Sequence, residues 1–294
     1  MTVNRVLFDA PGPRARRRIR WVTALAVLCV VAIVAAALRQ FADNGQLAAD
    51  RWQPFTQLSY LRVLGQGLVG TLKATAAAAV LSFPLGALLG LLRLSRNRVV
   101  RYLATGYVEL FRAVPLLLLI YAFLLALPPQ GINLPIFYKL VVPIVLVNTA
   151  VLAEVFRAGI RALERGQSEA AAAIGMTHWQ SMRTVVLPQA IRLVAPALVA
   201  QLVSLLKDST LGYIVSYPEL MKQGNNLTVF THLLIQTYLI IAVVYVAINF
   251  ALSQLANALQ RRLQRTRRPG RGADAVPERP ATGALKPTVT TILH

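Results

Sequence analysis

Ionisable side chains inside apolar segments are the residues of this chain whose types and spacing could do chemistry. Glu109 and Arg112 lie three residues apart, and Glu154 and Arg157 repeat that spacing. Residues three apart share one face of a helix, so each pair can form an ion pair. Charges in apolar spans are costly and are functional candidates by default. Because both pairs fall within a turn or two of a segment end, we favour stabilisation of the structure or of a gate over contact with a ligand.

Two further polar sites lie deeper in apolar segments. Asn148 is in the middle of one, where its amide needs a partner; a hydrogen bond between helices and a contact along a transport pathway both remain open. Lys207, Asp208, Ser209 and Thr210 lie about 20 residues into another segment, roughly 30 Å from its start. This group could bind the ammonium and carboxylate of an amino acid, or Lys207 and Asp208 could pair with each other.

Several familiar site types are not predicted. Cys29 lies in an apolar run and the three histidines, His178, His232 and His294, are scattered, so neither a disulfide nor a metal site is expected. Residues 65–70 match G-x-G-x-x-G but do not follow a strand, which argues against a dinucleotide site. The sequence has no Gly-Lys dipeptide and hence no Walker A loop. We therefore expect no cofactor and no enzymatic activity in this chain, and any ATP to be hydrolysed by another polypeptide.

The composition is that of a membrane protein. Hydrophobic residues make up 56% of the 294 residues, charged residues only 14%, and the mean hydropathy is +0.57. The net charge of +20 could suggest a nucleic-acid partner. However, the positive residues flank hydrophobic runs, where they act as topology signals. We expect membrane lipid around the chain and no nucleic acid.

Six apolar runs are long enough to cross a membrane. They are residues 21–38, 66–92, 105–127, 137–159, 189–213 and 232–259. The first run is longer than the apolar region of a signal peptide, so we expect it to be retained. Gly86 and Gly90 form a G-x-x-x-G pair, which either permits close helix packing or reflects plain tolerance of glycine in membrane helices.

The loop charges set the predicted topology. Lys and Arg concentrate in residues 1–20, 93–104, 157–187 and 260–294, and are fewer in 39–65, 128–139 and 211–231. Since cytoplasmic loops carry the excess of positive charge, both termini are predicted to be cytoplasmic. The prediction is an all-α membrane protein with six transmembrane helices. Its parts are a basic N-terminus (1–20), a first transmembrane helix (21–38), an external loop (39–64), a transmembrane domain (65–260) with a cytoplasmic loop at 160–188, and a basic, disordered tail (261–294).

The loop between the fourth and fifth spans is predicted to form two short helices. Ser168 can cap the first, Glu169 suits its first turn, and Gly175 fits the position just past its end, where positive φ is needed. Thr177 and Gln180 have the spacing of a capping box for the second.

The second short helix would show Trp179, Met182 and Val186 on one face. Pro188 should bias Leu187 out of helical geometry and end this helix before the next span.

Here the chain resembles a known family. The pattern Glu-Ala-Ala, three residues, Gly, nine residues, then an aliphatic residue, any residue and Leu-Pro is similar to the EAA loop of binding-protein-dependent ABC importer permeases. The matching residues are Glu169, Ala170, Ala171, Gly175, Val185, Leu187 and Pro188. Val185 stands where Ile is usual. The resemblance implies a coupling helix that docks in a groove of a cytoplasmic ATPase subunit, with Glu169 offering a charge to its rim. The alternative is a surface helix with no partner.

The resemblance covers roughly residues 60–260 and is nearest to the polar amino-acid branch, especially glutamate/aspartate permeases of the actinobacterial kind. The carrying segments are 67–72, 108–115, 153–159, 165–171, 204–211 and 217–220. It implies a type I importer permease fold in the plasma membrane. It also implies two ATPase subunits that bind ATP and Mg, a second permease subunit (a copy or a paralogue) and an external substrate-binding protein. The alternatives are an amino-acid transporter driven by an ion gradient and a membrane scaffold that transports nothing.

Overall fold

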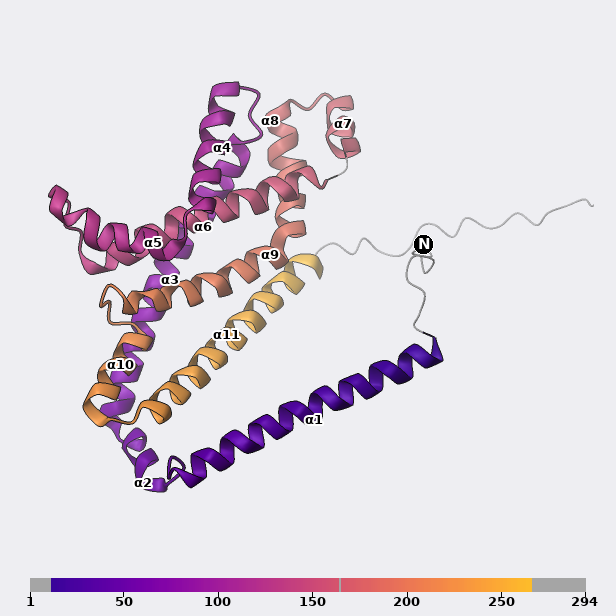
Figure 1. The fold of residues 1–294 in the computed structure, drawn as a ribbon. Helices are drawn as coiled ribbons and strands as arrows, with labels where there is room; N and C mark the ends of the chain where they lie inside the picture. Colours follow the sequence, from indigo (N-terminus) through magenta and orange to yellow (C-terminus); the bar gives the residue numbers. More distant parts are fainter. Residues whose placement is uncertain (1–11, 164, 266–294) are drawn as a thin grey trace, which may run out of the picture.

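The computed structural model describes residues 12–163 and 165–265, and these form helices joined by short turns, with no strand among them (Figure 1). The all-α prediction is confirmed. Residues 1–11 and 266–294, which hold the start of the basic N-terminus, most of the basic tail and His294, lie outside the described residues.

Five long helices are apolar enough to cross a membrane. They overlap the predicted runs but extend beyond most of them: α1 (Pro13–Asp43), α3 (Leu58–Leu92), α6 (Ile136–Arg161), α9 (Leu187–Asp208) and α11 (Leu234–Arg265). The span that contains α9 is longer than predicted, because it continues without a break from His178 to Tyr213. A sixth span exists if a bent pair of helices is counted as one.

That bent pair replaces the predicted straight span at 105–127. Helix α4 (Arg98–Ala113) and helix α5 (Leu116–Tyr121) meet at 95°. The break falls at Pro115, which has no N–H to donate and restricts the residue before it. Val114 accordingly has extended backbone angles, with φ −81° and ψ 122°. The side chain of Asn97 begins α4 by accepting from the backbone N–H of Val99 at 2.9 Å.

Short helices lie in two of the three loops predicted as external. The first loop holds α2 (Ala49–Trp52) and the last holds α10 (Leu220–Thr231), whereas α7 (Arg165–Ala173) and α8 (His178–Ser181) lie between α6 and α9. The remaining short segments are 3₁₀ turns at Gln53–Thr56, Pro128–Gln130 and Ser209–Tyr213, and π turns at Ala122–Ala126 and Met182–Val186.

The packing of α3 against α6 is the most extensive contact between helices. Gly86 and Gly90 lie at this contact: a Cβ on Gly86 would be 2.5 Å from the Cβ of Leu152, and one on Gly90 would be 2.9 Å from the carbonyl oxygen of Ala153. Both distances are shorter than packed atoms allow. The G-x-x-x-G pair therefore permits close approach of two backbones, which decides between the two interpretations that the sequence left open.

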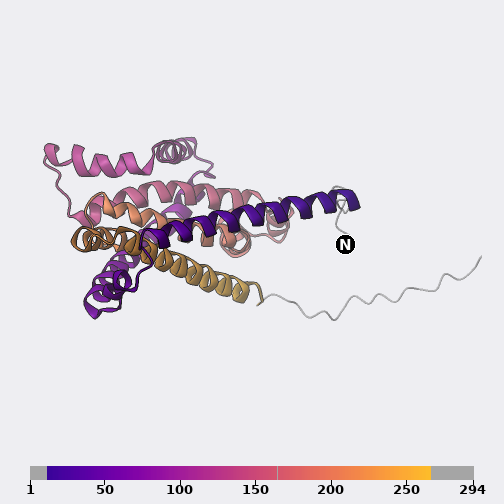
Figure 2. The ribbon, with the colours of Figure 1, turned by 60° about the horizontal axis from the view of Figure 1, so that its bottom comes forward.

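Helix α1 is separate from the other helices (Figures 1 and 2). None of its residues is buried. The turn after it is held to α11, since the side-chain amide of Gln236 donates to the carbonyl of Gln46 at 2.8 Å. In Figure 1, the start of α1, the end of α11 and helices α7 and α8 lie toward the right and top, while α2 and α10 lie at the lower left.

We predict that Gly86→Leu lowers the thermal unfolding midpoint of the purified protein in detergent. The new side chain would meet Leu152 and the backbone of Ala153, and overpacking of this kind costs about 1–3 kcal/mol. The matched control is Gly106→Leu in α4, where an added Cβ meets nothing within 4 Å. Equal midpoints for the two variants would contradict the close α3–α6 contact.

Candidate functional site

The predicted two-helix loop is present, and its central bend is built as expected. Gly175 has φ +83°, the left-handed conformation that glycine adopts at little cost. The N–H of Met176 donates to the carbonyl of Ala171 at 3.1 Å, and the N–H of Gly175 donates to that of Ala172 at 3.0 Å. These two bonds are a Schellman ending of α7.

The second short helix begins with the predicted capping box. The N–H of Gln180 donates to the hydroxyl of Thr177 at 3.3 Å, and the N–H of Thr177 donates to the side-chain oxygen of Gln180 at 2.8 Å. Two orphan backbone donors are thereby satisfied.

Two boundaries in this loop were predicted wrongly. Helix α7 begins at Arg165, so Ser168 lies inside it rather than at its cap. Leu187 is helical, with φ −62° and ψ −44°, and Pro188 does not end the second helix. Proline is tolerated in the first turn of a helix, and the wider π turn at Met182–Val186 comes directly before α9. As a result α8 leads directly into the membrane span.

The outer surface of the loop combines charge with exposed apolar groups. Glu169 and Ala170 are exposed, whereas Ala171 is buried. Ile174 and Trp179 are each 75% exposed, so Trp179 does not pack against the spans. Val186 is buried, and the predicted common face of Trp179, Met182 and Val186 is therefore not one packed surface.

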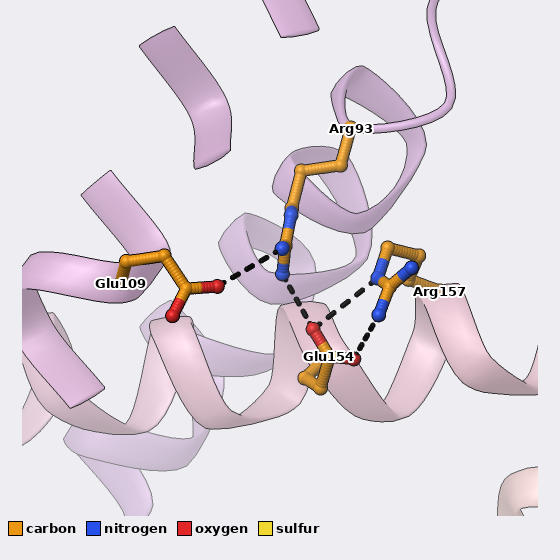
Figure 3. A network of polar contacts seen from close by, with 4 residues as sticks. All are labelled: Arg93, Glu109, Glu154 and Arg157. Carbon is orange, nitrogen blue, oxygen red and sulfur yellow. Dashed lines mark hydrogen bonds and ion pairs between the residues drawn. The ribbon is translucent and has the colours of Figure 1, made fainter. Parts of the chain in front are cut away.

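A network of four charged residues joins α3, α4 and α6 (Figure 3). Arg93, at the end of α3, is only 8% exposed. It donates to Glu154 at 2.5 Å and to Glu109 at 3.2 Å. Arg157 donates to both oxygens of Glu154. One buried guanidinium thus holds carboxylates from two other helices, using the fork of donors that arginine provides.

The two predicted ion pairs have different outcomes. Glu154 and Arg157 pair within α6 as expected. Glu109 and Arg112 do not pair, because Glu109 turns to Arg93 and Arg112 is exposed. A buried cation needs compensation more than an exposed one does, which explains why Arg93 takes the carboxylate.

A second polar network links α6 and α9. Asn148, only 2% exposed, donates to the carboxylate of Asp208 at 3.0 Å and to the carbonyl of Ile144 at 2.9 Å. Its side-chain oxygen accepts from the amide of Gln201. Asn148 therefore bridges two helices. Its partner on α9 is Asp208, which the sequence indicates as a candidate for substrate binding.

The other members of the 207–210 group do not join this network. Lys207 is exposed, and it forms no ion pair with Asp208 in the described structure. The hydroxyls of Ser209 and Thr210 donate to backbone carbonyls three residues back, both at 2.7 Å. Ser209 is also fully buried. Asp208 alone is brought to Asn148.

Residues 82–265 match a family described as the binding-protein-dependent transport system inner membrane component. This match covers well over half of the chain. The chain belongs to that family. Its members are membrane components of transport systems and not enzymes by themselves, and the apolar helices of this chain fit a multi-pass inner-membrane protein.

Curated members of the family are similar over most of the chain. The glutamate transport system permease protein GluD of Corynebacterium glutamicum is 34% identical over 82% of this chain and 89% of its own length. The glutamate/aspartate import permease protein GltK of Escherichia coli is 35% identical over 69% of this chain and 94% of its own. Both relatives are amino-acid permeases, as the resemblance of the sequence implied.

Solved structures of family members share the fold. A crystal structure of an amino acid ABC transporter with histidines has a TM-score of 0.67 and 32% identity, covering 71% of this chain and 97% of the other. The MetNI methionine ABC transporter, in an inward-facing conformation, has a TM-score of 0.60 at 20% identity, which supports the fold alone. The predicted importer permease fold is confirmed.

Sequence reasoning missed two residues of these networks. Arg93 follows an apolar run directly, so it was counted as a topology charge, and nothing local indicates that it is buried. Gln201 could have been found: it precedes Asp208 by seven residues, which places both on one face of a helix.

We predict that Arg93→Gln lowers the thermal midpoint far more than Arg112→Gln does. Removing Arg93 leaves Glu154 with Arg157 alone, and a hydrogen bond to a charged group contributes about 1.5–3 kcal/mol. Arg112 is an arginine on the same helix as Glu109 but has no ion pair in the described structure. Similar midpoints for the two variants in detergent would show that the network does not hold the helices together.

We also predict that Asn148→Leu destabilises the protein by about 1–3 kcal/mol, because Asp208 and Gln201 lose a buried partner. The control is Thr149→Val in the same helix turn, since the buried hydroxyl of Thr149 makes no hydrogen bond. Chemical unfolding in detergent measures both. A larger loss for Thr149→Val would contradict the proposed bridge.

Proposed function

We propose that this chain is the transmembrane subunit of an ATP-driven importer for a polar amino acid of the glutamate, aspartate or glutamine type. Two separate ATPase subunits would bind and hydrolyse Mg-ATP, and an external binding protein would deliver the amino acid. A second permease subunit, either a copy of this chain or a paralogue, would complete the pathway. Membership of the family and the amino-acid permeases among its relatives support this proposal.

The observation that carries the proposal is the surface of α7 and α8. Glu169 and Ala170 are exposed there beside Ile174 and Trp179, which are large apolar side chains left open to solvent. Ile174 lies before the span His178–Tyr213 and Trp179 lies in its first turn, and exposed apolar groups at such an end are candidates for a protein interface. Aromatic side chains are favoured anchors in such interfaces. We assign this surface to the ATPase subunit.

The positive charge of the loops supports a cytoplasmic location for this surface. Arginines cluster before the first span, after α3 and around α7, and the cytoplasmic side carries such an excess. Both termini would then also be cytoplasmic, and α2 and α10 would face the external binding protein.

The continuous helix from His178 to Tyr213 suggests how ATP hydrolysis moves the pathway. When the ATPase subunits close, α7 and α8 of the two permease subunits would approach each other. Because no break separates α8 from α9, this displacement would reach Asp208 at the other end of α9. The spans would then reopen toward the binding protein. Leu187 and Pro188 belong to this connection, and Gly175 sets the angle of α7.

The test is uptake by the reconstituted complex of permease, ATPase and binding protein, against a panel of amino acids. We expect ATP-dependent uptake of glutamate, aspartate or glutamine. Uptake that survives removal of the ATPase and stops when the ion gradient is dissipated would show a secondary transporter instead. If substrate did not stimulate ATP hydrolysis by the complex, the chain would be a membrane scaffold.

We predict that Glu169→Arg lowers uptake about tenfold or more while the subunit is still made and inserted. Reversing a charge at the interface with the ATPase subunit weakens binding of that subunit, and a loss of about 1.4 kcal/mol in binding free energy is already tenfold. The matched control is Glu169→Asp, which keeps the negative charge at the same exposed position and should keep uptake. Full ATP turnover and uptake in Glu169→Arg would refute the coupling role.

A further inference from the structure

One face of α3 carries three polar residues that the networks described above do not use. Arg62, Gln66 and Lys73, with Val69 between the last two, form a stripe at intervals of four, three and four residues. This spacing places them on one side of a helix. All four are exposed in the structure, whereas the opposite side of α3 is packed against α6 and α10.

Lys73 lies inside the apolar run of α3. It follows the first residue of that run, Gln66, by seven residues, which corresponds to roughly 10 Å at 1.5 Å per residue. An ionisable side chain within an apolar span is costly to expose to lipid and is by default a candidate for a functional contact. Neither Lys73 nor Arg62 has a hydrogen bond or ion pair within the described residues, so no carboxylate of this chain neutralises them there.

The stripe lines an open cavity of about 710 Å³. Its polar lining includes Arg62, Gln66, Lys73, Tyr217 and Gln223, and no acidic residue contributes to it. The volume falls in the range of small-molecule sites, roughly 300–1,000 Å³.

Glu219, which follows the lining residue Pro218 in the sequence, is an acidic residue whose carboxyl group is engaged in other hydrogen bonds. Glu219 is fully buried, and it begins α10 by accepting from the N–H groups of Met221 at 2.8 Å and Lys222 at 2.6 Å. It also accepts from the hydroxyl of Tyr245 at 2.9 Å. Burial raises the pKa of the Glu219 carboxyl, and its oxygens are engaged by these three donors rather than by Arg62 or Lys73. The cavity lining therefore carries two positive charges, Arg62 and Lys73, that no carboxylate of the described residues pairs with.

The wall opposite the stripe is fixed by a close contact. Pro218 approaches α3 so closely that a Cβ on Gly70 would collide with its carbonyl oxygen. The hydroxyl of Tyr217 donates to the carbonyl of Gly70 at 3.2 Å. One side of the cavity is therefore formed by the turn at Tyr217 and Pro218. This turn can contact α3 only because residue 70 is glycine.

We propose that this cavity binds the side-chain carboxylate of an anionic amino acid, with Lys73 as the deep binding residue and Arg62 at the mouth. The proposal rests on the proposed function and narrows it to acidic substrates. Lysine side chains in a helix lean toward its N-terminus, so the ammonium of Lys73 reaches toward Arg62 and the mouth. Gln66 and Gln223 offer amides to the remaining oxygens.

The experiment compares glutamate with glutamine, which has the same shape without the charge. In the reconstituted complex, Lys73→Gln should lower glutamate uptake relative to glutamine uptake about tenfold or more, since a hydrogen bond to a charged group is lost. Lys73→Arg should keep the wild-type ratio. The control is Lys222→Gln, whose ammonium lies 5.7 Å from the ring of Tyr213 and outside the cavity lining.

Glutamate titration into the purified permease in lipid nanodiscs gives a second readout that needs no ATP. Wild type should bind glutamate, and Lys73→Gln should lose that binding. If ATP-coupled uptake failed but glutamate binding remained, the proposed importer function would be refuted and the proposed binding site would not. Equal loss of glutamate and glutamine uptake in Lys73→Gln would overturn the proposal. So would unchanged glutamate binding combined with loss of co-purified anionic phospholipid, which would assign the cavity to a lipid headgroup.

Discussion

The close contact of α3 with α6 is the constraint on which the rest of the structure depends. Gly86 and Gly90 let the two backbones approach, and in doing so they bring the end of α3 to the acidic end of α6. Arg93 can then reach Glu154, and through the same guanidinium it holds Glu109 of the bent helix. A larger side chain at either glycine would separate the charges before it affected anything else. The ion network is therefore a consequence of small residues within about two turns of Arg93 on the same helix.

This arrangement gives the two networks different mechanical roles. The charged network ties α3, α4 and α6 into one body at the end nearest α7. The second network ties α6 to α9 farther along, through the amides of Asn148 and Gln201 and the single carboxylate of Asp208. In the proposed importer, α9 is the helix that continues from α8 and receives its displacement. Asn148 is then the point at which a moving helix meets a fixed one, and a change of partner at Asp208 is the natural consequence of that movement.

Local features were predictable from the sequence, and features that depend on distant contacts were not. The positive φ of Gly175 and the capping box of Thr177 and Gln180 follow from residues within one or two turns of each other. The helical geometry at Leu187 was mispredicted, because the π turn before Pro188 is an alternative that the proline rule does not consider. Pro115 could have indicated the break between α4 and α5. The break was not predicted, because the residues around Pro115 form one continuous apolar run.

The candidate site shows the same division. Glu154 and Arg157 pair as their spacing requires, but Glu109 chooses a partner that is 16 residues away. Spacing along one helix states which residues can meet, and burial decides which of them do. Lys73 could have been found from the sequence, since it is a single charge inside an apolar run. What the sequence could not supply is the turn at Pro218 that closes the opposite side of its cavity.

The distribution of paired and unpaired charge along the helices has a consequence for the direction of transport. Toward α7, the carboxylates of Glu109 and Glu154 are matched by Arg93 and Arg157, and the further arginines of this end lie in its loops. Near α10, Arg62 and Lys73 have no matching carboxylate among the described residues, so this end is positive. Unscreened charges in a cavity with low-dielectric walls raise the local concentration of an oppositely charged solute. If α10 faces the binding protein, the unpaired charges of Arg62 and Lys73 attract an anion at the entrance of the pathway, which an importer of acidic amino acids requires.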